Sequence, residues 1–219
     1  MMGKPGYFEL RNQLVEALRS SGYIKTGEVR RAFLAVPREE FVPESLADRA
    51  YIDTPLPIGH GQTISAPSMI AIMLENMDLE VGQNVLEIGS GSGYNAVLLH
   101  EMVKNRVITV ERMPELVELA KSNIKATGYS GGVEVVSGDG TMGYSAGMPY
   151  DRILVTAGAP EIPEPLVQQL GPGGILGIPV GRWQGFQDFA TVIKNEDGST
   201  RKLSHGGCAF VPLIGKHGW

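Results

Sequence analysis

The chain has 219 residues, of which 42% are hydrophobic and 20% charged. This composition fits one sizeable folded α/β domain, and no apolar run approaches the roughly 18 residues that a membrane helix needs. The formal net charge of −5 comes without a basic stripe, which argues against nucleic acid as a partner. A single cysteine, Cys208, excludes an internal disulfide, and the first residues lack an apolar leader. We therefore expect a cytoplasmic protein that binds neither nucleic acid nor membrane.

Two helices and a connector are predicted at the N-terminal end. Apolar residues recur at helical spacing over 7–20, and a second helix is predicted over 28–36, where Pro37 stops it. The prolines and charges of residues 37–43 indicate a rigid connector. Its Phe41 is interpreted as a core anchor.

The segment from 51 to 67 shows neither a helical nor a strand period. Loops of that length inside a compact domain are usually functional or disordered, and the prolines, aromatics and few charges here argue against disorder. A helix is predicted over 67–77, with Pro67 in its first turn. Thr63 and Ser65 therefore precede a helix start, where a hydroxyl can either cap the helix or act in catalysis.

The stretch 85–93 (VLEIGSGSG) is an apolar strand that breaks into three alternating glycines, and a helix is predicted to follow over 94–104. Such a corner presents free backbone N–H groups at the carboxyl end of a strand, where nucleotide-like cofactors bind. The pattern G-x-G-x-x-A from Gly91 also fits a dinucleotide site, with Glu111 placed as a ribose-binding acid. The glycines alone therefore do not choose between NAD and S-adenosylmethionine.

Glu87, just before the glycines, shifts that balance. A carboxylate facing the space where a pyrophosphate would lie places two anions together, at a cost in free energy. A cofactor with a cationic end and no phosphate, such as S-adenosylmethionine, suits this position better.

From residue 84 onward, strands and helices alternate. Strands are predicted at 84–88, 106–110, 133–136 and 151–156, and helices at 94–104, 114–127 and 165–170. The alternation predicts a mostly parallel twisted sheet with right-handed crossovers and helices on both faces. Glu87, Glu111 and Asp139 end or follow three successive strands, so we expect them to converge on one crevice. Each taken singly could instead be a helix cap.

The last part predicts a strand over 174–180 and an antiparallel hairpin of 188–194 and 201–211, with Asp197-Gly198 in its turn. A parallel sheet finished by an antiparallel hairpin is typical of S-adenosylmethionine methyltransferases, whereas dehydrogenases more often continue with another βαβ half. The expected fold is therefore a Rossmann-like class I methyltransferase. We expect one domain: N-terminal helices and a substrate loop (1–80), a cofactor-binding core (81–180) and C-terminal strands (181–219).

Five motifs spread over nearly the whole chain carry a resemblance to a known family. They are residues 37–43 (PREEFVP), 61–67 (GQTISAP), 87–94 (EIGSGSGY), 138–140 (GDG) and 211–213 (VPL). Together they resemble the protein-L-isoaspartate (D-aspartate) O-methyltransferases. Many methyltransferases share the glycine turn, whereas the 62–67 motif in front of it is specific to this family. One departure is Ala66, where many bacterial members carry glutamine and others alanine.

The resemblance implies transfer of a methyl group from S-adenosylmethionine to the free carboxylate of L-isoaspartyl, and less efficiently D-aspartyl, residues in damaged proteins. The products are S-adenosyl-L-homocysteine and a methyl ester, which cyclises to a succinimide that hydrolyses partly to aspartate. The partners would be damaged proteins and peptides, and we expect a monomer without a metal. A carboxylate is already ionised at pH 7 and needs no general base, which agrees with four histidines that have no evident partners.

The resemblance also implies site residues. Ser65 would be catalytic, its hydroxyl near the incoming carboxylate. Glu111 would accept the ribose hydroxyls and Asp139 the adenine amine, while Val180, Val211 and Leu213 would form a peptide wall. The expected cofactor-binding residues are Gln62, Thr63, Ile64, Glu87, Gly89, Ser90, Gly91, Gly93, Glu111, Arg112, Asp139 and Gly140.

Three rival readings stay open: a methyltransferase of a small-molecule carboxylate, an NAD-dependent oxidoreductase, and a cofactor-binding module without activity. A further hypothesis concerns the enzyme itself. Asp197-Gly198 is the kind of sequence that forms isoaspartate, because glycine leaves the succinimide route unhindered, so the enzyme is a candidate for its own methylation.

Overall fold

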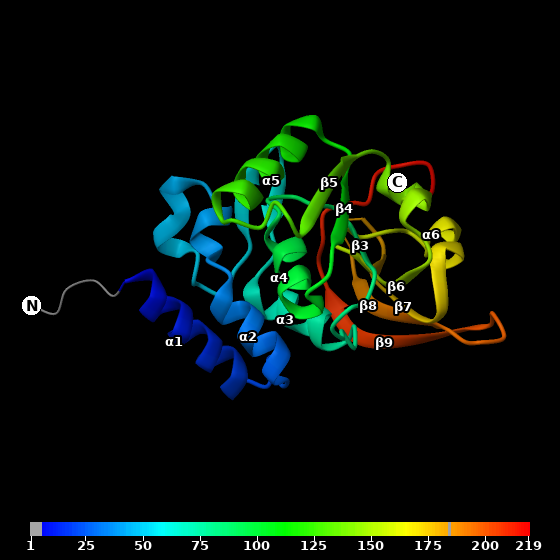
Figure 1. Ribbon diagram of the computed structural model, residues 1–219, viewed down its shortest axis with the longest axis horizontal. Helices are drawn as coiled ribbons and strands as arrows, with labels where there is room; N and C mark the ends of the chain where they lie inside the picture. The colour runs from blue at the N-terminus through cyan, green and yellow to red at the C-terminus, as the bar shows by residue number, and fades with distance from the viewer. Residues whose placement is uncertain (1–5, 184) are drawn as a thin grey trace, which may run out of the picture.

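The computed structural model describes residues 6–183 and 185–219, and its main feature is a mixed sheet in the order β5-β4-β3-β6-β7-β8-β9 (Figure 1). The strands are β3 (Val85–Ile88), β4 (Val107–Glu111), β5 (Val133–Ser137), β6 (Tyr150–Val155), β7 (Leu170–Gly181), β8 (Gln187–Lys194) and β9 (Thr200–Cys208). The pairs from β5 to β7 are parallel, and β8 and β9 are added antiparallel. The predicted parallel sheet with a terminal hairpin is confirmed.

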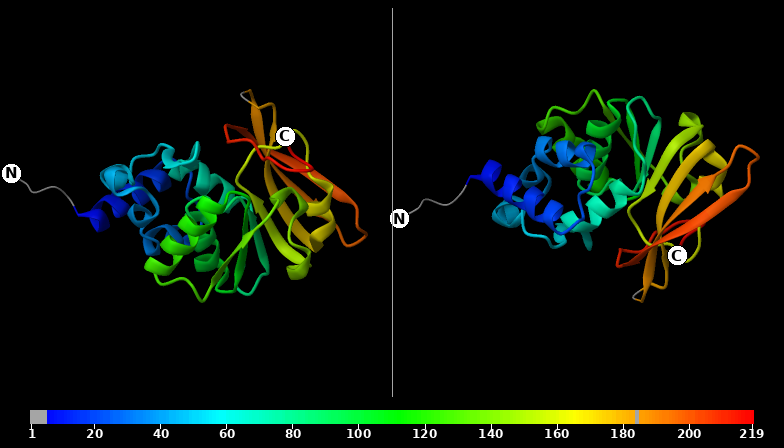
Figure 2. Two further views of the ribbon diagram at one scale, coloured as in Figure 1. Left: turned by 90° about the horizontal axis from the view of Figure 1, so that it is seen from above. Right: turned by 90° about the horizontal axis from the view of Figure 1, so that it is seen from below.

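Helices cover both faces of this sheet, as predicted. They are α1 (Tyr7–Ser20), α2 (Gly27–Ala35), α3 (Pro67–Glu75), α4 (Tyr94–Val103), α5 (Pro114–Ala126) and α6 (Glu164–Gln169), with 3-10 turns η1 (Arg38–Phe41), η2 (Glu44–Arg49), η3 (Gly140–Met142) and η4 (Ser145–Gly147). The larger helical group, α1 to α5, lies on one side of the sheet, and α6 lies on the other (Figure 2). None of the helices in 6–183 and 185–219 is long and apolar enough to cross a membrane.

Strand alternation explains how one sheet supports two apolar layers. In β3, Val85 joins the larger core with α1 to α5, whereas Leu86 and Ile88 join the smaller core beside α6. Every residue of β3 is buried, as expected for a parallel strand covered on both faces. The N-terminal helices share the larger core, since Leu14, Phe33 and Leu154 belong to the same buried cluster.

The absence of a strand period in 51–67 proved misleading. The segment contains a small antiparallel hairpin of β1 (Leu56–Gly59) and β2 (Gln62–Ile64). The strands are too short to show a period, and Pro57 hides the alternation of β1, in which Leu56 and Ile58 are the buried positions. The predicted connector similarly contains the 3-10 turn η1.

The C-terminal strand is shorter than predicted, ending at Cys208 instead of 211. The chain leaves the sheet there and crosses to the end of β6, where Gly158 N donates to the Val211 carbonyl and Leu213 N donates to the Gly158 carbonyl, both at 2.8 Å. Residues 211–213 therefore lie over the carboxyl end of β6. The first strand of the terminal meander, β7, begins at Leu170 instead of 174.

The order of the strands locates the site. β3 lies between β4 and β6, so the chain moves outward in one direction from β3 to β5 and in the other from β6 onward. At such a switch point the helical connections on the two sides diverge and leave a crevice at the carboxyl ends of the strands.

Candidate active site

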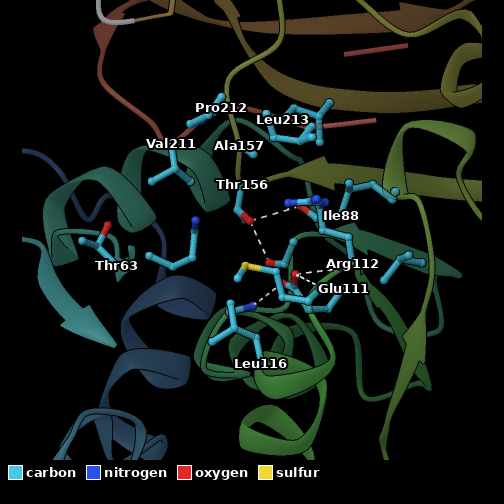
Figure 3. A pocket seen from close by; sticks show the side chains of 17 residues that line it. Thr63, Ile88, Glu111, Arg112, Leu116, Thr156, Ala157, Val211, Pro212 and Leu213 are labelled. Carbon is cyan, nitrogen blue, oxygen red and sulfur yellow. Dashed lines mark hydrogen bonds between the residues drawn. The ribbon is translucent and has the colours of Figure 1, made fainter. Parts of the chain in front are cut away.

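A cleft lies at this switch point, over the carboxyl ends of β3, β4 and β6 (Figure 3). Thr63 forms one side, Glu111, Arg112 and Leu116 lie across from it, and residues 211–213 close a third side. Its walls are Gln62, Thr63, Ile88, Gly89, Gly91, Val110, Glu111, Arg112, Met113, Leu116, Gly140, Thr156, Ala157, Val211, Pro212, Leu213 and Ile214.

A smaller cavity adjoins the cleft and contains Ser65. The two share the walls Thr63, Gly89, Gly91 and Thr156. The other walls of the smaller cavity are Ile64, Ser65, Ile70, Met73, Ser90, Ser92, Tyr94 and Asn95. A ligand in the cleft and a group beside Ser65 would therefore meet across the glycine turn.

The glycine turn is fixed by Thr156 at the end of β6. Gly89 has φ 97°, and a Cβ added there would lie 2.5 Å from Thr156 Oγ1. That hydroxyl donates to the Gly89 carbonyl at 2.8 Å. A side chain at residue 89 would break this contact and strain the backbone, so the turn lets the neighbouring strand approach closely.

Glu111 is held by three backbone N–H groups. Its Oε1 accepts from Arg112 N at 2.9 Å and Met113 N at 3.0 Å, and its Oε2 accepts from Gly91 N at 3.2 Å. A carboxylate has about four lone-pair directions. The side chain is therefore fixed in the cleft wall with room on Oε2 for one further donor, which is fewer than the two ribose hydroxyls expected from the sequence.

Glu87 lies elsewhere than its position in the sequence suggested. Its side chain is fully buried and lines neither cavity. It accepts from Asn95 Nδ2 at 2.8 Å and from Thr109 Oγ1 at 2.5 Å. Burial raises the pKa of Glu87 to about 8, so at pH 7 the carboxyl is mainly protonated. The side chain therefore does not face the space where a pyrophosphate would lie, contrary to the expectation from the sequence, because β3 buries its residues on both faces.

Asp139 also differs from its neighbours on the strand ends. Gly140 lines the cleft, but Asp139 does not. Its Oδ1 accepts from Thr141 N at 2.9 Å and Thr141 Oγ1 at 2.7 Å, and its Oδ2 accepts from Lys216 N at 2.9 Å. Of the three acids expected to converge on the crevice, Glu111 alone lines it.

Ser65 does not cap the helix that follows it. The N-cap position of α3 is Ala66, and Ser68 N at the helix start donates instead to Asp53 Oδ1 at 2.8 Å. The Ser65 hydroxyl has no hydrogen-bond partner within residues 6–183 and 185–219. It is therefore available to a ligand in the smaller cavity.

The structure adds residues that the sequence reasoning passed over. Thr156 contacts both cavities, and it could have been found as a polar residue closing a predicted strand, as Glu111 does. Pro212 and Ile214 extend the wall predicted for Val211 and Leu213, whereas Val180 pairs within the sheet and lines neither cavity. Gly93 similarly starts α4 without lining the cleft.

Few titratable side chains of the described residues line the two cavities. None of the histidines lines either cavity in the part of the chain that the structure describes. Nor do those residues contain a group of His, Cys, Asp and Glu side chains arranged to hold a metal ion. The site offers fixed dipoles, a carboxylate and free hydroxyls, which suit binding and orientation.

Fold and site together define a Rossmann-like α/β protein with a cleft at the switch point of its sheet and an adjoining cavity that contains Ser65. Comparison with known proteins gives the family. A sequence model described as protein-L-isoaspartate(D-aspartate) O-methyltransferase (PCMT) matches residues 9–218. The chain belongs to this family.

Individual relatives agree over almost the full length. The protein-L-isoaspartate O-methyltransferase of Methanopyrus kandleri is 59% identical over 211 residues, covering 95% of this chain and 93% of the relative. That of Pyrococcus horikoshii is 54% identical over 219 residues, covering 100% and 99%.

Solved structures are also similar. A structure titled protein-L-isoaspartate O-methyltransferase matches with TM-score 0.85 and 33% identity, covering 95% of this chain and 67% of the other. A putative enzyme of this name from Plasmodium falciparum, in complex with S-adenosyl-L-homocysteine, matches with TM-score 0.84 and 30% identity, covering 93% and 98%.

Proposed function

We propose that this chain is a repair methyltransferase. It uses S-adenosylmethionine to methylate the free carboxylate of L-isoaspartyl, and less efficiently D-aspartyl, residues in damaged proteins. The methyl ester then cyclises to a succinimide that hydrolyses partly to aspartate. The observation that carries this proposal is the meeting of the cleft and the Ser65 cavity at Gly89, Gly91 and Thr156.

The cleft fits the proposed cofactor. Its apolar side chains and its fixed carboxylate, Glu111, suit an adenosine, and among the described residues that line it only Arg112 supplies positive charge for a pyrophosphate. The match to a structure holding S-adenosyl-L-homocysteine supports the same assignment. When bound, the cofactor supplies an activated methyl group on a sulfonium.

The chain's own residues then bind the cofactor and support the glycine turn. Gln62, Thr63 and Gly140 contact the cofactor in the cleft, Glu111 accepts a ribose hydroxyl through Oε2, and the glycine turn faces the methionine end. Ile64 and Ser90, which line the smaller cavity, lie beside the transferring group. Glu87 acts from beneath, through Asn95 and Thr109, as a support of the turn.

Ser65 orients the substrate. A carboxylate with a pKa of about 4 is ionised at pH 7, so no residue has to remove a proton. The unpaired Ser65 hydroxyl can donate to one carboxylate oxygen and leave the other directed at the methyl group. The rate then depends on the alignment of the carboxylate oxygen with the methyl group and on exclusion of water. Such positioning lowers the activation free energy by several kcal/mol.

The proposal also covers the domain organisation of the chain and its cellular context. The shared core of α1 to β8 supports one domain over 1–219, with residues 1–80 forming the substrate side, 81–180 the cofactor core and 181–219 the cover. The expectations of a monomer, of a cytoplasmic location, of binding neither nucleic acid nor membrane, and of damaged proteins as partners stay predictions.

The test is a paired assay with labelled S-adenosylmethionine. An isoaspartyl peptide and its aspartyl twin are offered at equal concentration, and label is expected in the first alone. Equal labelling of both would contradict repair, labelling of neither would leave a small-molecule methyltransferase or a binding module, and a thermal shift with NAD in place of S-adenosyl-L-homocysteine would indicate an oxidoreductase.

A further inference from the structure

Arg38 in η1 is a buried arginine without a carboxylate partner. Only 1% of it is exposed. Its Nε donates to the Ala50 carbonyl at 2.9 Å, and its Nη2 donates to the Ser65 carbonyl at 2.8 Å. It forms no ion pair within the described ranges 6–183 and 185–219, and its Nη1 is buried without a hydrogen-bond partner.

The same guanidinium also packs on the glycine turn's helix. Its Cζ lies 5.2 Å from the centroid of the Tyr94 ring, and Tyr94 is the first residue of α4, directly after Gly93. Phe41 also packs against the Tyr94 ring, with the ring centroids 5.4 Å apart in an edge arrangement. One side chain thus joins the connector, the Ser65 loop and the start of α4.

Stability alone does not explain why an arginine is buried at this position. Removing an ion from water costs several kcal/mol even after relaxation, and an apolar side chain of similar volume is often neutral or better. What arginine adds is a planar fork that can hold two carbonyls in a fixed relation, which neither lysine nor methionine can do. In Arg38 those carbonyls belong to the end of η2 and to Ser65.

We propose that Arg38 is a positioning residue for methyl transfer. Its fork fixes the Ser65 backbone, so that the Ser65 hydroxyl points into the cavity beside the glycine turn. The inference rests on the proposed role of Ser65. It assigns to the 37–43 motif a task at the site, although Arg38 itself lines neither cavity.

The chain offers a matched control in Arg152. This arginine is also buried, and its Nε and Nη2 donate to the carbonyls of Met77 and Asp78. It lies near the start of β6, at the end of the parallel strands opposite to the cleft. Unlike Arg38, it also forms an ion pair with Asp78, at 3.7 Å. Arg152→Met therefore removes a similar fork to two carbonyls without touching the Ser65 loop.

The experiment compares three variants, Arg38→Met, Arg38→Lys and Arg152→Met, with the wild type. Amide hydrogen exchange reports on the backbone of residues 62–68. Calorimetry with S-adenosyl-L-homocysteine measures cofactor binding, and kinetics with an isoaspartyl peptide measure methyl transfer. Arg38→Met is expected to speed exchange in 62–68 and lower kcat, each at least about tenfold, with the dissociation constant changed less than about threefold. Arg38→Lys keeps the charge but not the planar fork, so its exchange rate and its kcat should lie between those of Arg38→Met and the wild type. Arg152→Met should lower Tm and leave 62–68 and kcat as in the wild type.

Each outcome decides the inference. Exchange over 62–68 that is the same in the Arg38 and Arg152 variants overturns it, as does an unchanged kcat in Arg38→Met. If Arg38→Met does not fold, Arg38→Lys carries the same comparison. If the wild type methylates no isoaspartyl peptide, the proposed function fails, and the exchange data still show whether Arg38 fixes the Ser65 loop.

Discussion

The carboxylate of Asp139 binds the C-terminal segment of the chain, with its Oδ2 2.9 Å from the backbone N of Lys216. The neighbouring Thr141 hydroxyl accepts from His217 N at 3.1 Å. Since residues 211–214 line the cleft just before this contact, the end of β5 holds the cleft's cover in place. Asp139 can therefore influence cofactor binding without touching the adenine.

A double-variant comparison separates the two roles. Lys216→Pro removes the N–H donor and leaves Asp139 intact, whereas Lys216→Ala keeps the N–H and serves as control. If Asp139 acts through the segment, Asp139→Asn and Lys216→Pro should each weaken binding of S-adenosyl-L-homocysteine by about tenfold, and the double variant should be no weaker. Weakening by Asp139→Asn alone would place Asp139 at the adenine, as the family resemblance implies.

Ser65→Ala should lower turnover of an isoaspartyl peptide by about 10- to 1000-fold, since one positioned donor is lost. Binding of S-adenosyl-L-homocysteine should be nearly unchanged, because the hydroxyl lies in the smaller cavity. Ser68→Ala is the control, since Asp53 binds the backbone N of that residue and not its side chain. Wild-type turnover in Ser65→Ala would remove Ser65 from the mechanism.

Glu111→Ala should weaken cofactor binding by well over about 1 kcal/mol, because three backbone N–H groups lose their acceptor along with the ribose. Calorimetry with S-adenosyl-L-homocysteine measures this directly. Glu115→Ala, at an exposed position in the first turn of α5, should bind like the wild type. An unaltered dissociation constant for Glu111→Ala would contradict the placement.

Stability should depend on pH through Glu87. Burial, with a smaller contribution from the charge of Glu111, raises the pKa of this carboxyl from 4.5 to about 8, against hydrogen bonds from Thr109 and Asn95. Between these values the folded protein keeps a proton that the unfolded chain has released. The free energy of unfolding should therefore fall as pH rises, by up to about 1.4 kcal/mol per pH unit.

Glu87→Gln keeps the shape of this side chain and removes the titration. Denaturant unfolding from pH 5 to 8 should show the stability of Glu87→Gln, relative to the wild type, growing with pH. The exposed Glu118→Gln should run parallel to the wild type. Parallel curves for Glu87→Gln would show that Glu87 is already ionised in the folded protein at pH 5.

Self-methylation at Asp197 would require a second molecule. β8 runs antiparallel to β7, so the turn between β8 and β9 lies at the end of the strands opposite to the cleft. This turn, which contains Asp197, forms the tip of the projecting hairpin (Figure 1). Aged enzyme incubated with labelled cofactor should take up label faster per molecule at higher protein concentration. Asp197→Glu, whose longer side chain forms no five-membered succinimide, should abolish this uptake; label retained in that variant would place the damage elsewhere.

The sequence by itself determined the order of elements, the parallel sheet, the terminal hairpin and the glycine turn. These follow from local patterns, since buried parallel strands are continuously apolar and a backbone with positive φ selects glycine. Each of these features depends on residues near one another in the chain. The family resemblance carried by the 62–67 motif implied a role for Ser65, and the structure then brought this residue into one cavity with the turn.

Only the tertiary structure decided which strand-end acids face the cleft. Glu87, Glu111 and Asp139 occupy similar places in the sequence, yet one is buried beneath the turn, one lines the cleft, and one holds the C-terminal segment. The partners that distinguish the three positions, Asn95, Gly91 and Lys216, lie 8, 20 and 77 positions away along the chain. The contact from Arg38 to Ser65, 27 positions apart, is hidden for the same reason: packing brings distant backbone groups together, and the free energy of burial selects which polar groups they satisfy.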